Sequence, residues 1–373
     1  MKQYDVIIVG GGLAGLIAAL HLSHKNYSIL VVEKKEYPHH KVCGEYLSNE
    51  VIPYLNRLGV SFEGIQTKSI KTLLLSSSSG KSLQTELPLG GMGISRFVLD
   101  HLLFAQALKR GVDFLTDNVL TIEYRKDAFE VGTEQGDKFD AHLVIGAYGK
   151  RSSLDKSLKR SFIHKKSSWM AVKAHYENND FPDDMVALHN FNGGYAGLSR
   201  TETGAVNFCY LTSYKSFQRE KNIQDFNSNI IAENPFLGEF LKTSKPIFKE
   251  PLTIAQISFE GKNAVDNHII MCGDTAGLIH PLCGNGMAMA IHSAKIASEL
   301  IFDYLESKDR NRAQLESNYR TLWGEAFKKR LWAGRQFQAI LLNKTLSGVA
   351  INLAIQTPML LHRLIKSTHG KTL

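Results

Sequence analysis

Apolar residues near the N-terminus fall into two patterns that are separated by a run of glycines. Residues 5–9 form a short run rich in Val and Ile, residues 10–15 read GGGLAG, and residues 16–22 show the apolar spacing of a helix. A strand that leads through a tight glycine turn into a helix is typical of a dinucleotide-binding unit. A second strand, predicted for residues 28–32, ends in Glu33. The chain is therefore predicted to begin with a Rossmann-like βαβ unit.

The glycines of this turn have separate roles in such a unit. Gly10 permits the tight turn, Gly12 lets the backbone approach a diphosphate, and Gly15 allows the helix to pack closely on the strand. The helix N-terminus adds free N–H groups and the positive end of its dipole. Glu33 follows the turn at roughly the 20-residue spacing of a carboxylate that binds ribose hydroxyls. The turn predicts a dinucleotide ligand; its alternative is a purely structural turn, and it does not by itself separate FAD from NAD.

A second glycine-rich signature lies far along the chain. Residues 268–272 are predicted to form a buried strand, and Gly273 and Asp274 follow it directly; glycines 284 and 286 then precede a helical pattern over residues 287–305. An Asp at a strand end can reach a ribityl or ribose hydroxyl, and the glycines let the backbone lie against a flat ring. The helix would direct its N-terminus at a flavin on which negative charge builds up during reduction. The alternative is one more ordinary α/β turn.

From residue 169 to residue 211 the pattern changes to alternating apolar and polar residues with glycine turns between the runs. Strands are predicted for residues 170–176, 185–191, 195–200 and 206–211, which together indicate an antiparallel sheet over the cofactor. Strand residues of this kind are most often core, but four of them could line a pocket for a mostly apolar substrate with one polar group. These candidate substrate-binding residues are Trp169, His189, Tyr195 and Arg200.

The two glycine signatures together resemble those of the aromatic hydroxylase and geranylgeranyl reductase superfamily of FAD enzymes, to which flavin-dependent halogenases are related. The likeness includes Arg96, because the superfamily places an Arg near the FAD diphosphate at this position. It implies FAD as the cofactor and NAD(P)H as a transient electron donor. The chain departs from the hydroxylases at Tyr148, which stands where they have an Asp associated with both FAD and NAD(P)H. This difference weakens the implication for NAD(P)H more than that for FAD.

The resemblance and the patterns together predict an α/β (α+β) fold. A discontinuous, Rossmann-like FAD-binding domain is expected from residues 1–75, 92–165 and 255–300. An antiparallel-sheet domain for the substrate, formed by residues 76–91 and 166–254, is inserted into it, and residues 301–373 form a C-terminal helical segment.

The residues expected to contact FAD belong to the two signatures, to the segment after the second strand and to the helix start at Arg96. They are Gly10, Gly12, Leu13, Ala14, Gly15, Glu33, Lys34, Lys41, Cys43, Gly44, Arg96, Gly273, Asp274, Pro281, Gly284, Asn285, Gly286 and Met287. Cys43 is also the candidate catalytic residue, because in the superfamily this segment passes the isoalloxazine ring and geranylgeranyl reductases have a similar Cys-Gly there. A thiol with Lys41 nearby could donate a proton to a carbon reduced by hydride transfer, or it could simply pack.

The overall composition narrows the possible partners. Of the 373 residues, 43% are hydrophobic and 21% are charged, as in an ordinary folded protein. The net charge of +8 is spread along the chain, so nucleic acid is not expected as a partner. The four cysteines lie far apart without a CxxC pair, so no metal site is predicted and a reducing cytoplasm fits best.

The C-terminal segment combines apolar residues with basic ones, among them Arg363, Lys366 and Lys371. No stretch of the chain reaches the roughly 18 uninterrupted apolar residues that a membrane-spanning helix needs. The segment is expected to cap the pocket, and its basic, amphipathic character could also let it rest on an anionic membrane as a peripheral contact.

These features predict an FAD-dependent oxidoreductase, and the leading hypothesis is a monooxygenase. Reduced FAD would combine with O2 to a C4a-hydroperoxyflavin and hydroxylate an aromatic or lipid-like small molecule. Alternatives that stay open are a reductase of C=C bonds in an isoprenoid or acyl substrate, a flavin-dependent halogenase and, outside enzymes, an FAD-binding redox sensor.

Overall fold

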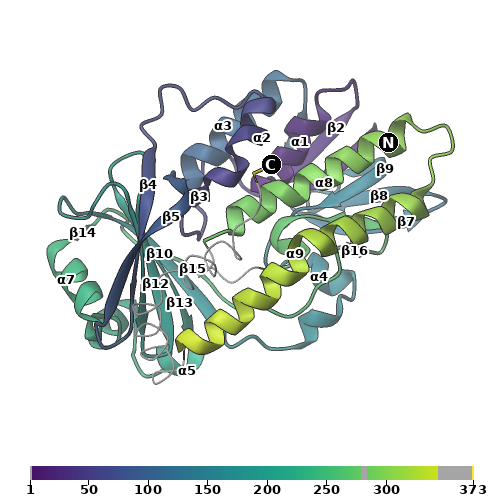
Figure 1. Ribbon diagram of the computed structural model, residues 1–373. Coiled ribbons are helices and arrows are strands. Elements are labelled where there is room, and N and C mark those ends of the chain that lie inside the picture. Colours follow the sequence, from purple (N-terminus) through teal and green to yellow (C-terminus); the bar gives the residue numbers. More distant parts are fainter. Residues whose placement is uncertain (1, 279–283, 343–371) are drawn as a thin grey trace.

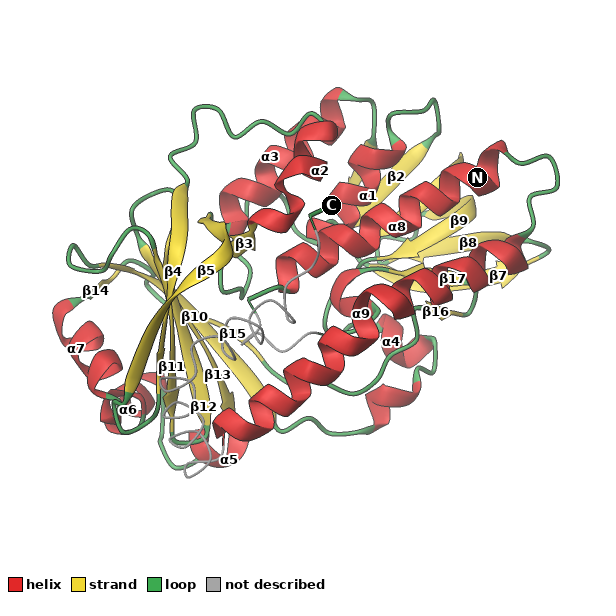
Figure 2. Cartoon of the chain, in the orientation of Figure 1, coloured by secondary structure: helices red, strands yellow, loops and turns green. Residues whose placement is uncertain are grey.

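Two β-sheets of different construction lie on opposite sides of the molecule, with helices packed on and between them (Figures 1 and 2). The computed structural model describes residues 2–278, 284–342 and 372–373. One sheet contains the N-terminal strand, and the other is formed mainly by the middle of the chain. The predicted α/β (α+β) fold, with a Rossmann-like sheet, a second antiparallel sheet and helices toward the C-terminus, is confirmed.

The first sheet has eight strands, in the order β16–β17–β9–β1–β2–β6, with β8 paired to β9 and β7 paired to β8. Its central strands β17, β9, β1, β2 and β6 are parallel. Because both faces of such a sheet are covered, β2 and β17 are buried along their whole length, and β1 and β9 end in the apolar runs VIIV and LVIG. The bounds are β1 Lys2–Val9, β2 Ile29–Glu33, β6 Asp113–Thr116, β7 Val119–Arg125, β8 Ala128–Thr133, β9 Lys138–Gly146, β16 Val265–Asp266 and β17 Ile269–Met271.

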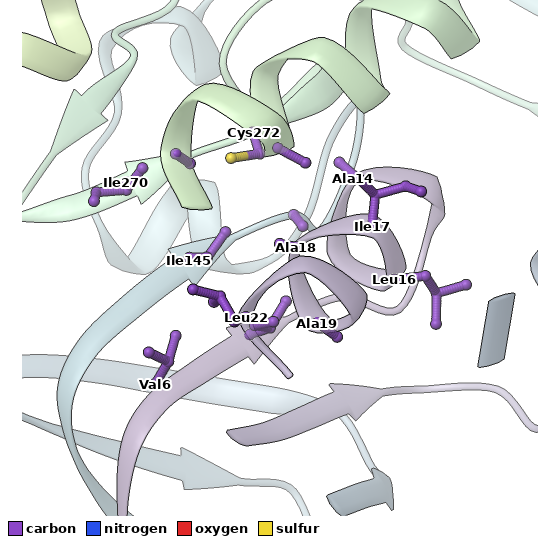
Figure 3. Packing of buried hydrophobic residues seen from close by; sticks show 14 of the residues in the cluster. Val6, Ala14, Leu16, Ile17, Ala18, Ala19, Leu22, Ile145, Ile270 and Cys272 are labelled. Carbon is purple, nitrogen blue, oxygen red and sulfur yellow. The ribbon is translucent and has the colours of Figure 1, made fainter. Parts of the chain in front are cut away.

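The helix after the first glycine turn, α1 (Leu13–Leu22), is apolar on every side, and all its residues except His21 are buried. It packs against α3 (Arg96–Lys109) and α8 (Gly286–Glu306). Figure 3 shows Ala14 and Ile17 of α1 in one apolar cluster with Cys272, which follows β17. Burial of each large aliphatic side chain here stabilises the fold by roughly 1.5–3 kcal/mol.

The second sheet has nine strands, in the order β14–β10–β13–β12–β11–β4–β5–β3, with β15 also paired to β10. Adjacent strands in this sheet are antiparallel, except for the parallel pair β4–β11. The four strands predicted between residues 169 and 211 are present. The bounds are β3 Tyr46–Ser48, β4 Lys68–Ser76, β5 Ser82–Gly93, β10 Trp169–Glu177, β11 Met185–Phe191, β12 Gly194–Arg200, β13 Val206–Ser213, β14 Lys245–Pro246 and β15 Leu252–Ile254.

The second sheet begins earlier in the chain than the expected segment 76–91. Strands β3 and β4 belong to it, although β3 and all of β4 except its last residue, Ser76, lie in the segment 1–75 that the sequence assigned to the FAD-binding domain. The reason is that β4 forms a long hairpin with β5 and pairs on its other edge with β11. Pairing between such distant segments has no local signature in the sequence.

One face of the second sheet is covered by its own small helices. Side chains such as Phe226, Leu237 and Phe240 pack against Phe208 and Tyr210 of β13. These helices are α5 Tyr214–Phe217, α6 Ile223–Asn229 and α7 Pro235–Thr243; elsewhere lie α2 Ile52–Arg57, α4 Leu154–Ser157 and α9 Arg312–Leu342. The other face of the sheet is left for the FAD-binding domain.

The structure describes only part of the predicted C-terminal helical segment. The helices α8 and α9 fall in or near the expected helical segment, whereas Arg363, Lys366 and Lys371 lie outside the described residues. Within the part of the chain that the structure describes, no helix has the length and apolar character needed to cross a membrane.

His189 lies on the helix-covered face and gives the fold a pH dependence. Its ring stacks on Phe236 with 5.1 Å between ring centroids, and its Nδ1 forms a 2.7 Å hydrogen bond with the Ser76 hydroxyl. Burial lowers the pKa of His189 to about 4, from the 6.5 of an ordinary histidine. Between these two values the unfolded chain binds a proton that the folded chain does not.

We therefore expect the free energy of unfolding to decrease as the pH falls from about 6.5 toward about 4. The variant His189→Gln removes one of the groups responsible, so its stability should change less steeply with pH in this window. Denaturant unfolding between pH 4.5 and 7 measures both slopes. Equal slopes in the two proteins would show that His189 is not neutral in the folded state.

Candidate cofactor and substrate site

A cavity of about 630 Å³ runs from the carboxyl ends of the parallel strands to the open face of the second sheet. Most of the residues predicted to contact FAD line it: Gly10, Gly12, Leu13, Ala14, Glu33, Lys34, Lys41, Cys43, Gly44, Arg96, Gly273, Asp274, Gly284, Gly286 and Met287. Gly15 and Asn285 lie behind this wall, and Pro281 is outside the described residues. The structure thus brings together side chains and turns that are widely separated in the sequence.

The two glycine signatures meet directly. A β-carbon placed on Gly273 would lie 3.1 Å from the Cβ of Ala14 in α1 and 3.5 Å from the Cβ of Ala290 in α8. Gly273 also has a φ of +59°, and its N–H donates to the Ser293 hydroxyl at 2.8 Å. A side chain at this position would strain the backbone and push the two helices apart.

The first glycine turn is closely packed at two of its glycines. A β-carbon on Gly10, which has a φ of +102°, would lie 2.5 Å from the carbonyl oxygen of Ala147. One on Gly15 would lie 2.0 Å from the carbonyl oxygen of Gly10. These glycines let α1 and the end of β9 approach the turn, as the glycine pattern predicts.

Gly12 differs from Gly10 and Gly15 because a side chain at this position would face basic groups across the cavity. A β-carbon there would have as its nearest neighbours the Lys41 ammonium at 3.6 Å and the Arg96 guanidinium at 3.7 Å. Arg96 donates two 2.7 Å hydrogen bonds to Asp100, and Lys41 lies 3.6 Å from carboxylate oxygens of both Asp100 and Glu33. Two cations beside a helix N-terminus are the groups that bind a diphosphate.

Glu33 ends β2 at the edge of this basic region. Its Oε2 accepts a 2.8 Å hydrogen bond from the Gly11 N–H, and its side chain is almost completely buried while still lining the cavity. The Tyr37 hydroxyl donates to the carbonyl of Gly11 from the other side. The carboxylate is therefore held at the turn, at the wall of the cavity.

The second signature is tied to the turn after β9 by residues that the sequence analysis did not single out. Lys262 donates 2.8 Å hydrogen bonds to the carbonyls of Lys150 and Asp274, and the Gly149 N–H donates to the Thr275 hydroxyl at 2.8 Å. Burial lowers the pKa of Lys262 to about 8. These bonds fix Asp274, in the 3₁₀ turn Gly273–Thr275, at the cavity.

The N-terminus of α8 forms another part of the wall. Gly284 has a φ of +65°, and a β-carbon on it would lie 3.3 Å from the ring of Tyr46. Gly286 and Met287, in the first turn of α8, line the cavity beside it. The free N–H groups of this turn lie where they would favour negative charge on a bound ring.

The second sheet supplies an apolar floor. Among the residues that line the cavity are Leu188, Tyr195, Gly197, Cys209 and Leu211, which are cross-strand neighbours on one face. Of the four predicted substrate-binding residues, Tyr195 alone lies in this lining.

The other three candidates lie elsewhere because side chains alternate between the faces of a strand. His189, next to Leu188, points toward α7, and Arg200 pairs with Asp183 at 2.7 Å on that side of the sheet. Trp169 shares the orientation of Ala171 but sits at the end of β10, where it packs edge-on against Phe259. The prediction that these three residues line the pocket is not supported by their positions.

Cys43 is half-buried on the cavity wall between the two domains. Its sulfur accepts a hydrogen bond from the Glu45 N–H at 3.4 Å and interacts with the Arg96 guanidinium. Its carbonyl oxygen accepts a 3.1 Å hydrogen bond from the Asn207 side chain of β13. The thiol is thus next to a cation and an N–H donor.

Sequence reasoning missed a cluster of buried charges that begins in this wall, at Glu45, and continues behind it. Lys173 and His175 of β10 both contact the carboxylate of Glu45, and the Glu45 and Lys173 side chains are fully buried. The available signal was a lysine and a histidine at alternate positions of a strand that is otherwise apolar or aromatic up to Tyr176.

The FAD binding domain family matches residues 3–312 of the chain. A digeranylgeranylglycerophospholipid reductase of Methanococcus vannielii is 25% identical over 359 residues, which cover 91% of this chain and 87% of the reductase. Conditioned medium factor receptor 1 of Dictyostelium discoideum is 21% identical over 351 residues, covering 87% of this chain and 68% of the receptor.

The fold is shared with solved structures. That of the flavin-dependent brominase Bmp2 superposes with a TM-score of 0.81 at 16% identity, covering 98% of this chain and 93% of the brominase. At this identity the likeness concerns the fold alone. Because the family match spans most of the chain and includes both glycine signatures, the protein belongs to the FAD binding domain family and is an FAD-dependent oxidoreductase.

Proposed function

We propose that this oxidoreductase acts on a mostly apolar, lipid-like small molecule and that it saturates a carbon–carbon double bond. The observation that carries the proposal is the junction of two environments in one cavity. A basic, glycine-lined part and an apolar part floored by the second sheet meet at the thiol of Cys43. Saturation of a double bond needs both a hydride donor and a proton donor. At this junction the cofactor would supply the hydride and Cys43 the proton.

In this proposal the basic part holds FAD. Lys41, Arg96 and the N-terminus of α1 bind its diphosphate, Glu33 and Asp274 bind hydroxyl groups, and the N-terminus of α8 faces the ring. Bound FAD supplies the hydride chemistry. NAD(P)H remains the electron donor that we propose for its reduction.

The apolar part selects the substrate. Leu188, Leu211, Ile254 and Ile257 line it, and each methylene that a substrate buries against such side chains contributes about 0.8 kcal/mol. A hydrocarbon chain can therefore be bound without directed polar contacts. The reductase of M. vannielii, by its name, acts on a phospholipid with geranylgeranyl chains, and this relationship supports the same substrate class.

Cys43 is proposed to supply the proton. Its S–H bond breaks as a C–H bond forms on the carbon next to the one that accepts the hydride. The thiolate that remains is stabilised by Arg96 and by the Glu45 N–H. Reprotonation from solvent returns the thiol to its starting state.

Hydroxylation, the leading hypothesis from the sequence, is retained as a second candidate. It is favoured by the apolar floor, since a dry pocket protects oxygenated intermediates from water. Halogenation is a third candidate. Lys173 is fully buried and paired with Glu45, so it is not available at the cavity, whereas Lys150 lines the cavity and interacts electrostatically with Cys209 of the floor.

The first test concerns the cofactor. Gly12→Val would place its side chain in the space between Gly12 and the two basic groups, where the diphosphate is proposed to bind. We expect roughly 100-fold weaker FAD binding, about 2.8 kcal/mol, with a loss of stability of only about 1 kcal/mol at this helix N-cap. Titration of FAD fluorescence and thermal unfolding measure the two effects.

Gly261→Val is a control, because a β-carbon on Gly261 has no neighbouring atom within 4 Å and one on Gly12 has none closer than 3.6 Å, but only Gly12 lines the cavity. It should bind FAD as the wild type does. Unchanged FAD binding by Gly12→Val would refute the assignment of the basic part to the diphosphate.

The second test concerns the reaction. Dithionite-reduced protein, kept free of oxygen, is mixed with a geranylgeranyl lipid, and mass spectrometry follows the gain of two hydrogens. We expect saturation by the wild type and at least a roughly 100-fold slower rate for Cys43→Ser, while reoxidation of the flavin by O2 stays unchanged in this variant. A product that forms only with oxygen and gains one oxygen atom would instead establish hydroxylation.

A further inference from the structure

We infer that Glu45, together with Lys173 and His175, is a positioning cluster that fixes residues 41–46 against the second sheet and thereby sets the environment of the bound flavin. This inference depends on FAD binding but not on which reaction the enzyme catalyses. Glu45 lies in the cavity wall, Lys173 and His175 contact it from behind, and none of the three is assigned a chemical step.

The carboxylate of Glu45 is satisfied on both oxygens by groups from different elements. Oε1 accepts from the Lys173 ammonium of β10 and from the Arg96 N–H at 2.8 Å, at the start of α3. Oε2 forms a 2.7 Å hydrogen bond with Nε2 of His175. One side chain therefore joins the second sheet to a helix of the FAD-binding domain.

The backbone of the same segment is held from the sheet as well. The carbonyl oxygens of residues 41, 43 and 44 accept hydrogen bonds from Lys173 at 3.2 Å, Asn207 at 3.1 Å and Ser199 at 3.0 Å. Glu45 has a φ of +55°, a conformation that a residue other than glycine rarely adopts without support. The network supplies that support.

Charge balance explains why the cluster can be buried. An isolated carboxylate in this position would be destabilised by loss of hydration. Burial alone would raise the pKa of Glu45, but Lys173 and His175 outweigh this effect and lower it. Buried ion pairs add little net stability compared with apolar packing, whereas they do fix relative positions. The cluster is therefore best suited to fix the position of residues 41–46 relative to the second sheet.

A metal site made from the same residues is disfavoured. Ligand atoms of His40, Glu45 and His175 lie within 4.8 Å of one another, as a metal site would require. However, the Lys173 ammonium already neutralises Glu45, and Nε2 of His175 is engaged with its carboxylate. A further cation would be repelled by this ammonium.

The cluster is connected to the proposed flavin site through Glu45 and its immediate neighbours in the chain. Gly44, Glu45 and Tyr46 all line the cavity, and the Tyr46 ring packs against Gly284 before α8. Cys43 precedes them on the same wall. A change at Glu45 that releases this segment must therefore move the surface that the flavin ring contacts.

The test compares Glu45→Gln with Glu316→Gln. Glu316 is a matched control, since it is also buried and also lies between a histidine and a basic group, His268 at 2.8 Å and Arg320 at 3.1 Å, but it does not line the cavity. We expect Glu45→Gln to bind FAD at least tenfold more weakly and to shift the visible absorption and circular dichroism of the bound flavin. Glu316→Gln should lose stability with wild-type flavin spectra. Wild-type FAD affinity and spectra in folded Glu45→Gln would overturn the inference.

Two further measurements test the inference even if Glu45→Gln does not fold. The double variant Glu45→Gln, Lys173→Met removes both buried charges and should fold while keeping the shifted flavin spectrum; a wild-type spectrum would contradict the proposal. In the wild-type protein, FAD should slow hydrogen exchange in residues 41–46, and no change there would also contradict it. If the wild-type protein binds FAD but does not saturate the double bond, while Glu45→Gln shows the shifted flavin spectrum, the proposed reaction is rejected and the positioning role is unaffected.

Discussion

The close approach of α1 and α8 at Gly273 is the constraint on which the rest of the site depends. With a β-carbon, this residue would lie within 3.1 Å of Ala14, and its φ of +59° already favours glycine. Because no side chain intervenes, the first glycine turn and Asp274 face the same cavity although they lie at opposite ends of the domain in the sequence. An elongated dinucleotide needs binding groups separated in this way. The apolar packing of α1 on all sides holds the two helices in that arrangement.

Features with a local physical cause could be predicted from the sequence. The first glycine turn is such a feature, because close contacts of Gly10 and Gly15 with neighbouring backbone demand glycine at fixed spacing. The strands between residues 169 and 211 are another, since a two-residue alternation marks a strand wherever its partners lie. Arg96 could be placed only through resemblance, yet the structure puts it opposite Gly12.

The face of each strand from β10 to β13 could not be predicted, and the reason is that both faces of these central strands of the second sheet are buried. His189 and Leu188 are neighbours in β11, but the first packs under α7 and the second lines the cavity. A sheet with one face in water would have revealed its inner side by polarity. The contact between Lys173 and Glu45 was equally hidden, because it joins residues 128 positions apart. Such a pair becomes visible only when strand register and domain arrangement are both known.

Strand register also explains how one sheet can both hold the cofactor segment and receive an apolar substrate. His175, Asn207 and Ser199 are cross-strand neighbours, and all three bond to the segment from Cys43 to Glu45. Two residues along each strand, Lys173, Cys209 and Gly197 form the next row, followed by Ala171, Leu211 and Tyr195. Polarity thus decreases from the segment that carries Cys43 toward the apolar floor. Since a shift of one residue would turn every one of these side chains to the opposite face, the same register that builds the sheet determines where the thiol and the substrate meet.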